Sequence, residues 1–270
     1  MTVATIDAPV SDGRSGPFKP AIDLSLLFRR YLLQLSRSPV WLVVGFSTPL
    51  LYLALFSPLL KHLVGVPGFR PGNVYDEFLP GILSLLAFSS GTGPGFNTIF
   101  ELRDGVIERF RVTPASRFAI LIGPLLAAML FMFVLDAIVV LIGFALGFQI
   151  RLLGLAVLAV LLGLLMATMG SFSVAMALTI KEINGFAATV NGLLLPVLLL
   201  GGVLLPISFA PTWMQVIAHF DPLYYVVTAS RILALGVFGP PEVWQAFAVL
   251  VPLCLVVVTW ATSVVRRAVA

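Results

Sequence analysis

Long uncharged stretches alternate with short polar ones along most of the chain. A helix needs about 20 apolar residues to cross the roughly 30 Å hydrocarbon core of a bilayer. Six stretches reach this length, and we expect transmembrane helices at about 40–60, 79–100, 118–148, 152–180, 183–205 and 243–265. The third and fourth stretches are longer than a straight crossing requires, so we expect them to tilt or to protrude. The pattern predicts an all-α integral membrane protein with six transmembrane helices.

The N-terminal region divides into a polar tail and an amphipathic helix. Residues 1–20 are rich in Gly, Pro and Asp and lack an apolar core, which indicates a disordered cytoplasmic tail rather than a signal peptide. From 21 onward, between Asp23 and Pro39, a helical wheel places leucines and aromatics on one arc and Arg29, Arg30 and Arg37 opposite them. This pattern predicts a helix in the headgroup plane. A simple anchor and an active role both stay open.

The segment 101–117 carries seven charges in seventeen residues, between two stretches that hold only one. Leu102, Val106 and Phe110 recur every four residues, which predicts a short amphipathic helix at 101–113 that ends before Pro114. Its charged members are of both signs: Arg103, Asp104, Glu108, Arg109 and Arg111. Mixed charges suit an ion-paired contact with another protein, although a solvated loop explains the pattern equally well.

The segment 206–242 is too apolar for a solvated loop and too interrupted by proline for a straight crossing. We expect a re-entrant pair of short helices on the extracytoplasmic side, before the last transmembrane helix. Asp221 precedes Pro222 and is suited to cap the second short helix. The candidate residues of this outer hairpin are Trp213, Asp221, Pro222, Tyr225 and Arg231.

The composition supports the membrane assignment and the charges orient it. Hydrophobic residues make up 60% of the 270 residues, charged residues 10%, and mean hydropathy is +1.09. With both termini cytoplasmic, twelve of the sixteen basic residues fall on the cytoplasmic side, as the positive-inside rule requires. The net charge of +4 therefore reports topology, and we expect a lipid bilayer and no nucleic acid as partner. The single Cys254 excludes a disulfide within the chain.

Sequence motifs for catalysis and nucleotide binding are absent. No Gly-Lys-Ser/Thr phosphate loop, nucleophile elbow, zinc motif or dinucleotide fingerprint occurs, so we expect no catalytic, cofactor or metal site in this chain. The glycine-rich stretch Gly91–Gly95 lies inside an uncharged span with no flanking lysine. It predicts a kinked, closely packed part of the second helix, where Gly91 and Gly95 share a face and Pro94 interrupts the hydrogen bonds.

Two acidic positions carry alternative interpretations. Asp136 is the one carboxylate deep in a predicted span, where it needs a partner, a wet cavity or a proton. A structural or cavity-lining role and a proton-relay role both stay open, the first being favoured. His219 and Asp221 lie two residues apart and fit a catalytic dyad, although capping by Asp221 is the simpler interpretation.

Several motifs together resemble the type-2 ATP-binding-cassette exporter permeases, especially their daunorubicin-resistance, drug-export group. The motifs occur in the family's order: FLPGI at 78–82, LRDGVIERFRVTPASR at 102–117, GGVLLPIS at 201–208, Pro211-x-Trp213, and Asp221-Pro222-Leu223-x-Tyr225 followed by Arg231. The resemblance covers residues 21–270. It implies that two such permeases form the pore in a bacterial inner membrane, as a homodimer or with a sister permease.

The resemblance also implies that two separate ATPases bind ATP and Mg²⁺ and dock on the loop 101–117. The permease itself is then no enzyme, 101–113 is its coupling helix, and Arg29, Arg30 and Arg37 lie on a connecting helix near the ATPase. The first and fifth spans are similar to those that line the dimer interface in the family.

The cargo follows less directly. The spans are rich in Phe and Leu and hold few polar residues, which favours a hydrophobic or amphipathic drug or antibiotic. The candidate residues of the translocation path are Thr48, Ser89, Ser90, Asn97, Asp136 and Asn191. An exporter of glycolipids or polysaccharide precursors has the same layout. An intramembrane lipid-processing enzyme and a proton-coupled carrier are alternatives from other classes.

Overall fold

The computed structural model describes residues 19–36, 43, 45, 47, 49–55, 74–106, 117–204 and 206–269, and every element in these ranges is helical. In chain order the elements are α1 (Lys19–Ser36), α3 (Val74–Ser90), α4 (Gly93–Arg103), α6 (Arg117–Ala145), α7 (Leu152–Ile180), α8 (Ile183–Leu200), the 3₁₀ turn η1 (Ile207–Phe209), α9 (Thr212–Ala218), α10 (Pro222–Ala234) and α11 (Pro241–Val269). The all-α fold expected from the sequence is confirmed for this part of the chain.

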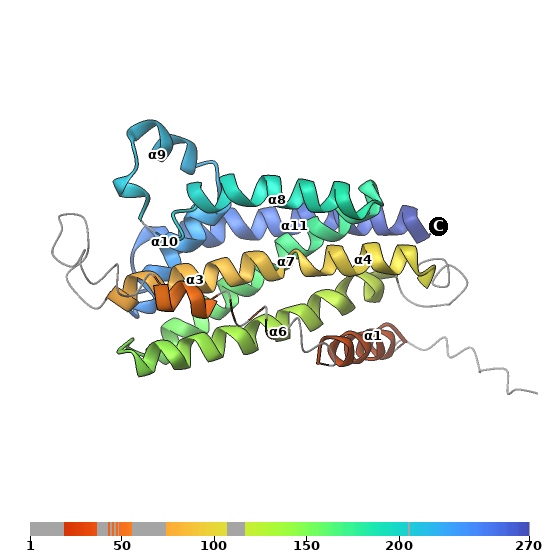
Figure 1. Ribbon diagram of the computed structural model, residues 1–270, viewed down its shortest axis with the longest axis horizontal. Helices are drawn as coiled ribbons and strands as arrows, with labels where there is room; N and C mark the ends of the chain where they lie inside the picture. The colour runs from red at the N-terminus through yellow and green to blue at the C-terminus, as the bar shows by residue number, and fades with distance from the viewer. Residues whose placement is uncertain are drawn as a thin grey trace, which may run out of the picture.

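The long helices lie side by side along one common direction (Figure 1). α1 lies at one end of this bundle, together with the last turns of α4, α7 and α11; we call it the α1 end. The short helices α9 and α10 lie at the opposite end, which we call the α9 end. α3 and α4 lie in line and together run from the α9 end to the α1 end.

Four of the described helices are long and apolar enough to cross a membrane: Leu121–Ala145 in α6, Leu152–Ile180 in α7, Ile183–Leu200 in α8 and Pro241–Ala268 in α11. They coincide with the third to sixth stretches predicted from the sequence. The second stretch is divided between α3, of 17 residues, and α4, of 11 residues. Of the first stretch, the described positions 43, 45, 47 and 49–55 are helical.

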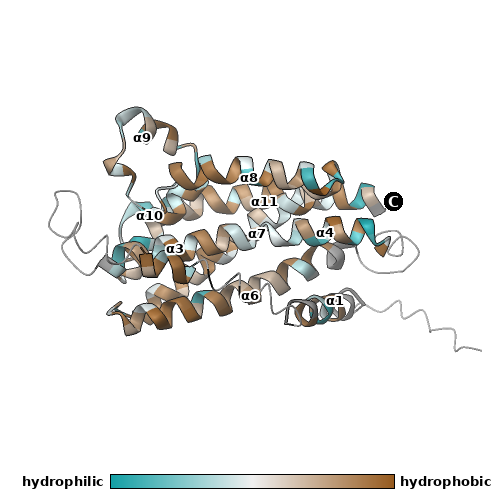
Figure 2. Ribbon diagram, in the orientation of Figure 1, coloured by the Kyte–Doolittle hydropathy of each residue, from teal (hydrophilic) through white to brown (hydrophobic). Residues whose placement is uncertain are grey.

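α7 is the central helix of the bundle. It packs against α3, α4, α6, α10 and α11. In its most apolar 18-residue segment 44% of the residues are buried, whereas in that of α8 only 6% are. Small residues allow the close approach, because a Cβ added to Gly170 would overlap the side chain of Leu125 on α6. Figure 2 shows hydrophobic residues along the middle of α6 and α8, and hydrophilic ones on α4 and α8 near the α1 end. Such a distribution suits a bundle that spans a bilayer.

Proline residues begin the elements between α8 and the last helix. Pro206 precedes η1, Pro211 precedes α9, and Pro222 and Pro241 are the first residues of α10 and α11. Proline suits these positions because the first amide of a helix has no partner within the helix. α10 is largely buried and packs against α3, α7 and α11. α9 is more exposed, and 64% of the Trp213 surface is accessible.

Candidate functional site

The N-terminal helix is fixed to the last turn of α4 by one carboxylate. The Tyr31 hydroxyl donates a hydrogen bond of 2.7 Å to Glu101 Oε1, and Arg30 Nη2 lies 3.1 Å from the same oxygen. Tyr31 is only 3% exposed, whereas the Arg30 side chain is 43% exposed. The buried hydroxyl rather than the solvated guanidinium therefore gives this contact its geometric precision. We call these three residues the α1–α4 junction.

Burial controls the ionisation of the α1–α4 junction. It raises the pKa of Glu101, while the hydrogen bond from Tyr31 and the charge of Arg30 act in the lowering direction. It also raises the pKa of Tyr31, and the nearby Glu101 charge raises it further. Tyr31 consequently remains a protonated donor at every physiological pH. The junction joins a predicted interfacial helix to the start of the predicted coupling helix.

The segment predicted as a coupling helix begins inside α4. Residues 101–103 form the last turn of α4, and the amide of Asp104 donates to the Phe100 carbonyl over 2.9 Å. Gly105 then takes the left-handed φ of 68°, which is strained for residues with a side chain, so the chain turns before Val106. Arg103 and Asp104 are exposed at this turn, and Leu102 is half-buried. Four other candidate coupling residues, Glu108, Arg109, Phe110 and Arg111, lie outside the described residues, as does Arg37.

The interruption between α3 and α4 has a specific partner on α7. The Ser173 hydroxyl donates to the Gly91 carbonyl at 2.7 Å and accepts the Gly95 amide at 3.2 Å. Backbone groups freed by a helix break are costly in a bilayer unless another helix satisfies them, and Ser173 does so on both sides. A Cβ on Gly95 would lie 2.7 Å from the Ser173 carbonyl oxygen, so glycine is required for this approach. The glycine stretch acts here in helix packing, as its sequence context indicated.

The polar residues proposed for a translocation path are distributed over several helices. Ser89 and Ser90 end α3, Asn97 lies on α4, and all three are half-buried. Asn191 is exposed on α8, and Thr48 lies outside the described residues. Among the described positions, no hydrogen bond joins one of these candidates to another.

Asp136 is the most isolated polar side chain of α6. It is 7% exposed, and neither carboxylate oxygen has a hydrogen-bond partner among the described residues. Buried carboxylates in membrane helices normally acquire a partner or line a cavity. Asp136 therefore lies in the packed interior, and no described residue serves as its proton acceptor or counterion.

At the α9 end, Arg231 of α10 connects three separate segments. It donates to the Glu77 carbonyl at 3.1 Å and to the Gly202 carbonyl at 2.8 Å, and its Nε lies 3.3 Å from Glu77 Oε1. Arg231 is 8% exposed, so both its charge and its donors are satisfied inside the protein. Glu77 directly precedes the FLPGI motif and Gly202 belongs to the GGVLLPIS motif. Motifs that are about 125 residues apart in sequence thus meet at one guanidinium.

The backbones around Arg231 also approach closely. A Cβ on Gly81 would overlap the carbonyl oxygen of Val203, so the two motifs can touch only through a glycine. One turn further, Ser84 of α3 and Ser230 of α10 share a buried hydrogen bond of 3.0 Å. We call Glu77, Gly81, Gly202 and Arg231 the outer clasp.

The His219–Asp221 pair makes separate contacts. Asp221 caps α10 by accepting the Leu223 amide at 2.9 Å, and burial raises the pKa of its carboxyl to about 6. His219 Nδ1 lies 2.7 Å from the Gln215 carbonyl, and the Tyr225 hydroxyl donates to the His219 carbonyl at 3.0 Å. Within the described residues, no hydrogen bond links His219 to Asp221. The geometry supports capping by Asp221 and shows no dyad.

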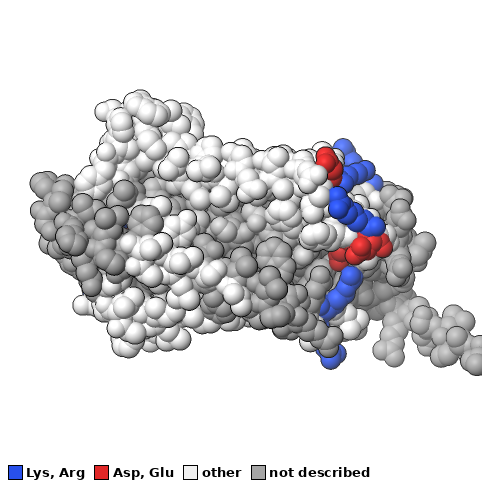
Figure 3. Space-filling view, viewed as in Figure 1, with Lys and Arg blue, Asp and Glu red and all other residues white. Residues whose placement is uncertain are grey.

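Charge gathers at the α1 end of the molecule. Figure 3 shows acidic and basic side chains side by side at this end, over the ends of the helices, and a largely uncharged surface along the bundle. No group of three or more His, Cys, Asp or Glu side chains that could hold a metal ion occurs in the part of the chain that the structure describes. The described charges therefore form a mixed-sign surface at the α1 end.

Three of the key contacts involve residues that the sequence patterns did not single out. Tyr31 counts as one more aromatic on the apolar arc of its helix, and Glu77 as one more charge before a span. Ser173 is a small residue in an apolar stretch, with no local signal of its role. Only the unsatisfied backbone implied by Pro94 indicated that some partner was needed, and the spacing could not say which.

The chain is similar to known membrane permeases over most of its length. The sequence profile of the family described as ABC-2 type transporter matches residues 23–235. The putative transport permease ycf38 of Cyanophora paradoxa is 32% identical over 217 residues, which cover 78% of this chain and 73% of that protein. The daunorubicin resistance ABC transporter permease protein DrrB1 of Streptomyces coeruleorubidus is 29% identical over 218 residues, which cover 78% and 74%. The chain therefore belongs to the ABC-2 type transporter family of membrane permeases.

Proposed function

We propose that the chain is the transmembrane permease subunit of an ATP-driven exporter, energised by a separate ABC ATPase that docks on the loop 101–117. Permeases of this family generally work with such an ATPase subunit. The α1–α4 junction carries the proposal, because it joins the interfacial helix α1 to the helix that leads into the docking loop. A force applied at the loop then reaches α1 and α4 together.

The proposed topology has six spans with both termini in the cytoplasm of a bacterial cell, the protein lying in its inner membrane. α1 and the last turns of α11 lie at the same end of the bundle (Figure 1). Among the described residues, that end holds eight basic residues, namely Lys19, Arg29, Arg30, Arg103, Arg117, Lys181, Arg266 and Arg267. The α9 end holds two, Arg151 and Arg231. This asymmetry supports a cytoplasmic α1 end.

A second permease copy would complete the pore. α8 is the least buried of the four long apolar helices, because only 6% of the residues in its most apolar 18-residue segment are buried. It exposes Leu193, Leu195 and Leu199 together with the polar Asn191. A helix that carries an amide among exposed leucines is suited to a protein interface, where the amide finds a partner that lipid does not provide. This supports a dimer across α8 and, with it, two docking sites for ATPases.

The proposed cargo is a hydrophobic or amphipathic drug or antibiotic. The similarity to a daunorubicin resistance permease supports this class, and so does the scarcity of polar groups in the spans. A glycolipid or polysaccharide precursor is the second candidate, because the same fold serves it. Resistance profiling with and without the permease and its ATPase separates the two cargo classes.

Two rival classes have a direct test at Asp136. A proton-coupled carrier would use this carboxyl as its relay, and a lipid-processing enzyme would use it or His219. We expect Asp136→Asn and His219→Ala to retain ATP-dependent efflux, also after the proton gradient is collapsed. Loss of efflux on collapse, with ATP maintained, would identify a carrier instead.

The docking assignment is tested by a charge exchange in the loop, Glu108→Arg with Arg109→Glu. Net charge is unchanged, so we expect normal membrane insertion but weaker co-purification of the ATPase and weaker dye efflux. The control is the same exchange at the opposite end, Glu242→Arg with Arg151→Glu, which should leave ATPase association intact. If the loop variant co-purifies and pumps like the native pair, the docking site lies elsewhere.

A further inference from the structure

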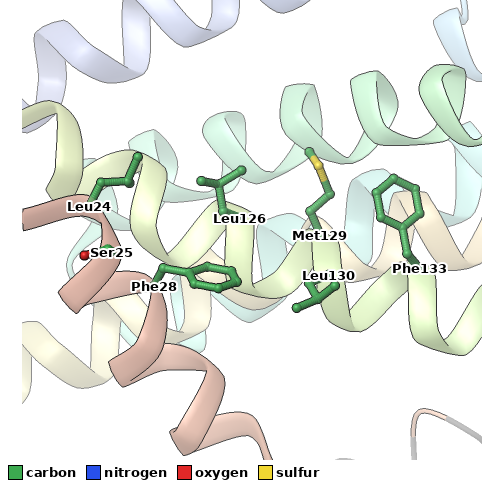
Figure 4. Close-up of a pocket in the computed structure, with 7 residues that line it drawn as sticks. All are labelled: Leu24, Ser25, Phe28, Leu126, Met129, Leu130 and Phe133. Atoms are coloured by element: carbon green, nitrogen blue, oxygen red, sulfur yellow. The ribbon is translucent and has the colours of Figure 1, made fainter. Parts of the chain in front are cut away.

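An apolar groove opens between α1 and α6 (Figure 4). It has a volume of about 460 Å³, and its lining residues are Leu24, Ser25, Phe28, Leu126, Met129, Leu130 and Phe133. Six of these seven side chains are apolar. Leu126 to Phe133 extend the groove along about 10 Å of α6, away from the α1 end. This direction is the one that a lipid acyl chain takes from the headgroup plane into the bilayer.

The groove exists because two helices touch at one point and then diverge. A Cβ on Gly123 would lie 2.9 Å from the Leu27 Cβ, so α1 and α6 are in closest contact there. α1 crosses the direction of α6, as Figure 4 shows, and the space beyond the contact is left between Phe28 and Leu130. On the inner wall, the Phe133 ring packs against Gly163 of α7, where an added Cβ would lie 3.3 Å from the ring's Cζ. Leu130 is 41% exposed, so the groove faces the surroundings of the bundle.

Two adjacent arginines of α1 differ by about 100° in direction around the helix. At 100° per residue, Arg29 lies about 40° from Ser25 around the helix, and Arg30 about 140° from it. Arg30 reaches Glu101 at the α1–α4 junction. Arg29 is exposed at the Ser25 edge of the groove, about 100° around the helix from Phe28, and has no ion pair within the described part of the chain. A positive charge therefore stands beside the mouth of an apolar groove.

We propose that this groove binds one anionic phospholipid, with an acyl chain between α1 and α6 and the phosphate at Arg29. Charge complementarity selects this occupant: the guanidinium matches a phosphate in the headgroup plane, and the apolar lining matches the chain. The groove holds a single hydroxyl, that of Ser25, and so offers little to a polar cargo. The lipid fills the gap that the two diverging helices leave and fixes the outer side of α1, opposite the contact with Glu101. The proposal does not depend on the cargo or on the ATPase.

Native mass spectrometry of the full chain in detergent tests the proposal, with phosphatidylglycerol and phosphatidylcholine of identical acyl chains as probes. We expect the first phosphatidylglycerol to bind more tightly than the first phosphatidylcholine. Arg29→Gln should weaken phosphatidylglycerol binding about fivefold, the effect of one basic residue at the membrane surface, and leave phosphatidylcholine unchanged. Arg29→Lys should keep the preference. The control is Arg266→Gln, which removes an exposed arginine from α11 at the same end.

Groove filling provides the second arm. Leu130→Trp should lower the first binding of both lipids, whereas Leu141→Trp, at a 61% exposed position of the same helix, should not. Equal weakening by Arg29→Gln and Arg266→Gln would mean diffuse charge attraction and would overturn the site. Native lipid binding in Leu130→Trp would overturn it as well. Loss of daunorubicin binding without loss of phosphatidylglycerol binding in that variant would assign the groove to cargo instead.

Discussion

Ser173 on α7 and Gly91, the residue directly after α3, are joined by a hydrogen bond of 2.7 Å although they are 82 residues apart in sequence. The same hydroxyl accepts the Gly95 amide from the other side of the break. It also shares its proton with the Gly170 carbonyl of its own helix, at 2.9 Å. One side chain thus takes the place of the backbone hydrogen bonds that α3 and α4 lose between them.

Replacing Ser173 by alanine should destabilise the protein by about 1 to 2 kcal/mol, because the buried Gly91 carbonyl loses its hydrogen bond from Ser173 and the buried Gly95 amide keeps only the Thr92 carbonyl, at 3.2 Å. The midpoint of thermal unfolding in detergent measures this. Ser263→Ala is the matched control, since Ser263 is exposed and bonds only within its own turn of α11. Equal midpoints for the two variants would show that the break is stabilised by packing alone.

Arg231→Met should be the most damaging single change at the α9 end, with a loss of about 3 kcal/mol, since it leaves buried carbonyls and Glu77 without their cation. Glu77→Gln should cost less, because the hydrogen bonds from Arg231 to backbone carbonyls remain. Expression level and unfolding midpoint serve as measurements. Arg267→Met, at an exposed position, should change neither. A lower unfolding midpoint for Glu77→Gln than for Arg231→Met would contradict the outer clasp.

Tyr31→Phe should loosen the α1–α4 junction by about 1.5 kcal/mol, the value of a hydrogen bond to a charged group. The loss of the donor also removes an influence that lowers the Glu101 pKa, so the carboxyl should titrate at still higher pH in the variant. Unfolding midpoints between pH 4 and pH 7 measure both effects. Tyr224→Phe is the control, because the Tyr224 hydroxyl has no hydrogen-bond partner among the described residues. Identical pH profiles for Tyr31→Phe and the native chain would refute the assignment.

The free energy of unfolding of Asp221→Asn, compared with that of the native chain, should increase as pH rises. Burial raises the Asp221 pKa from 3.8 to about 6, so the folded state holds the proton more tightly than the unfolded state does. The stability from this group is therefore complete below pH 3.8 and is lost as pH rises to about 6. Asparagine keeps the cap on the Leu223 amide without ionising. Unfolding at pH 4 and pH 7 checks the sign, with the exposed Asp104→Asn as control; a growing native advantage toward pH 7 would contradict it.

Sequence reasoning predicted the elements that depend on uncharged length. The stretches that became α6, α7, α8 and α11 are evident because a bilayer imposes a fixed thickness on any helix that crosses it. Gly91 and Gly95 were also predictable as packing positions, since glycine next to proline in a span has few other uses. Local patterns that depend on charge and proline were therefore sufficient for the outline of the fold.

The contacts between distant segments could not be derived in this way. The sequence showed Arg231, FLPGI and GGVLLPIS as separate motifs, and only the packing of α3 against α10 brings Glu77 and Gly202 to one guanidinium. Tyr31 likewise acquires its role from a carboxylate 70 residues away. Hydropathy carries no information on which apolar faces meet, so these pairings require the three-dimensional structure.

In the proposed exporter, the break opposite Ser173 would make α4 a lever that is separate from α3. With 11 residues, α4 is about 16 Å long, and its Glu101 end lies at the charged end of the bundle. The arm from Gly93 to Glu101 is about 12 Å, so a displacement of about 3 Å at Glu101 would correspond to a tilt of about 14° around the break. α3, held by Arg231 at its far end, need not rotate with it. In that mechanism, the position of the break would set the ratio between the displacement of the loop and the tilt of the helix inside the bilayer.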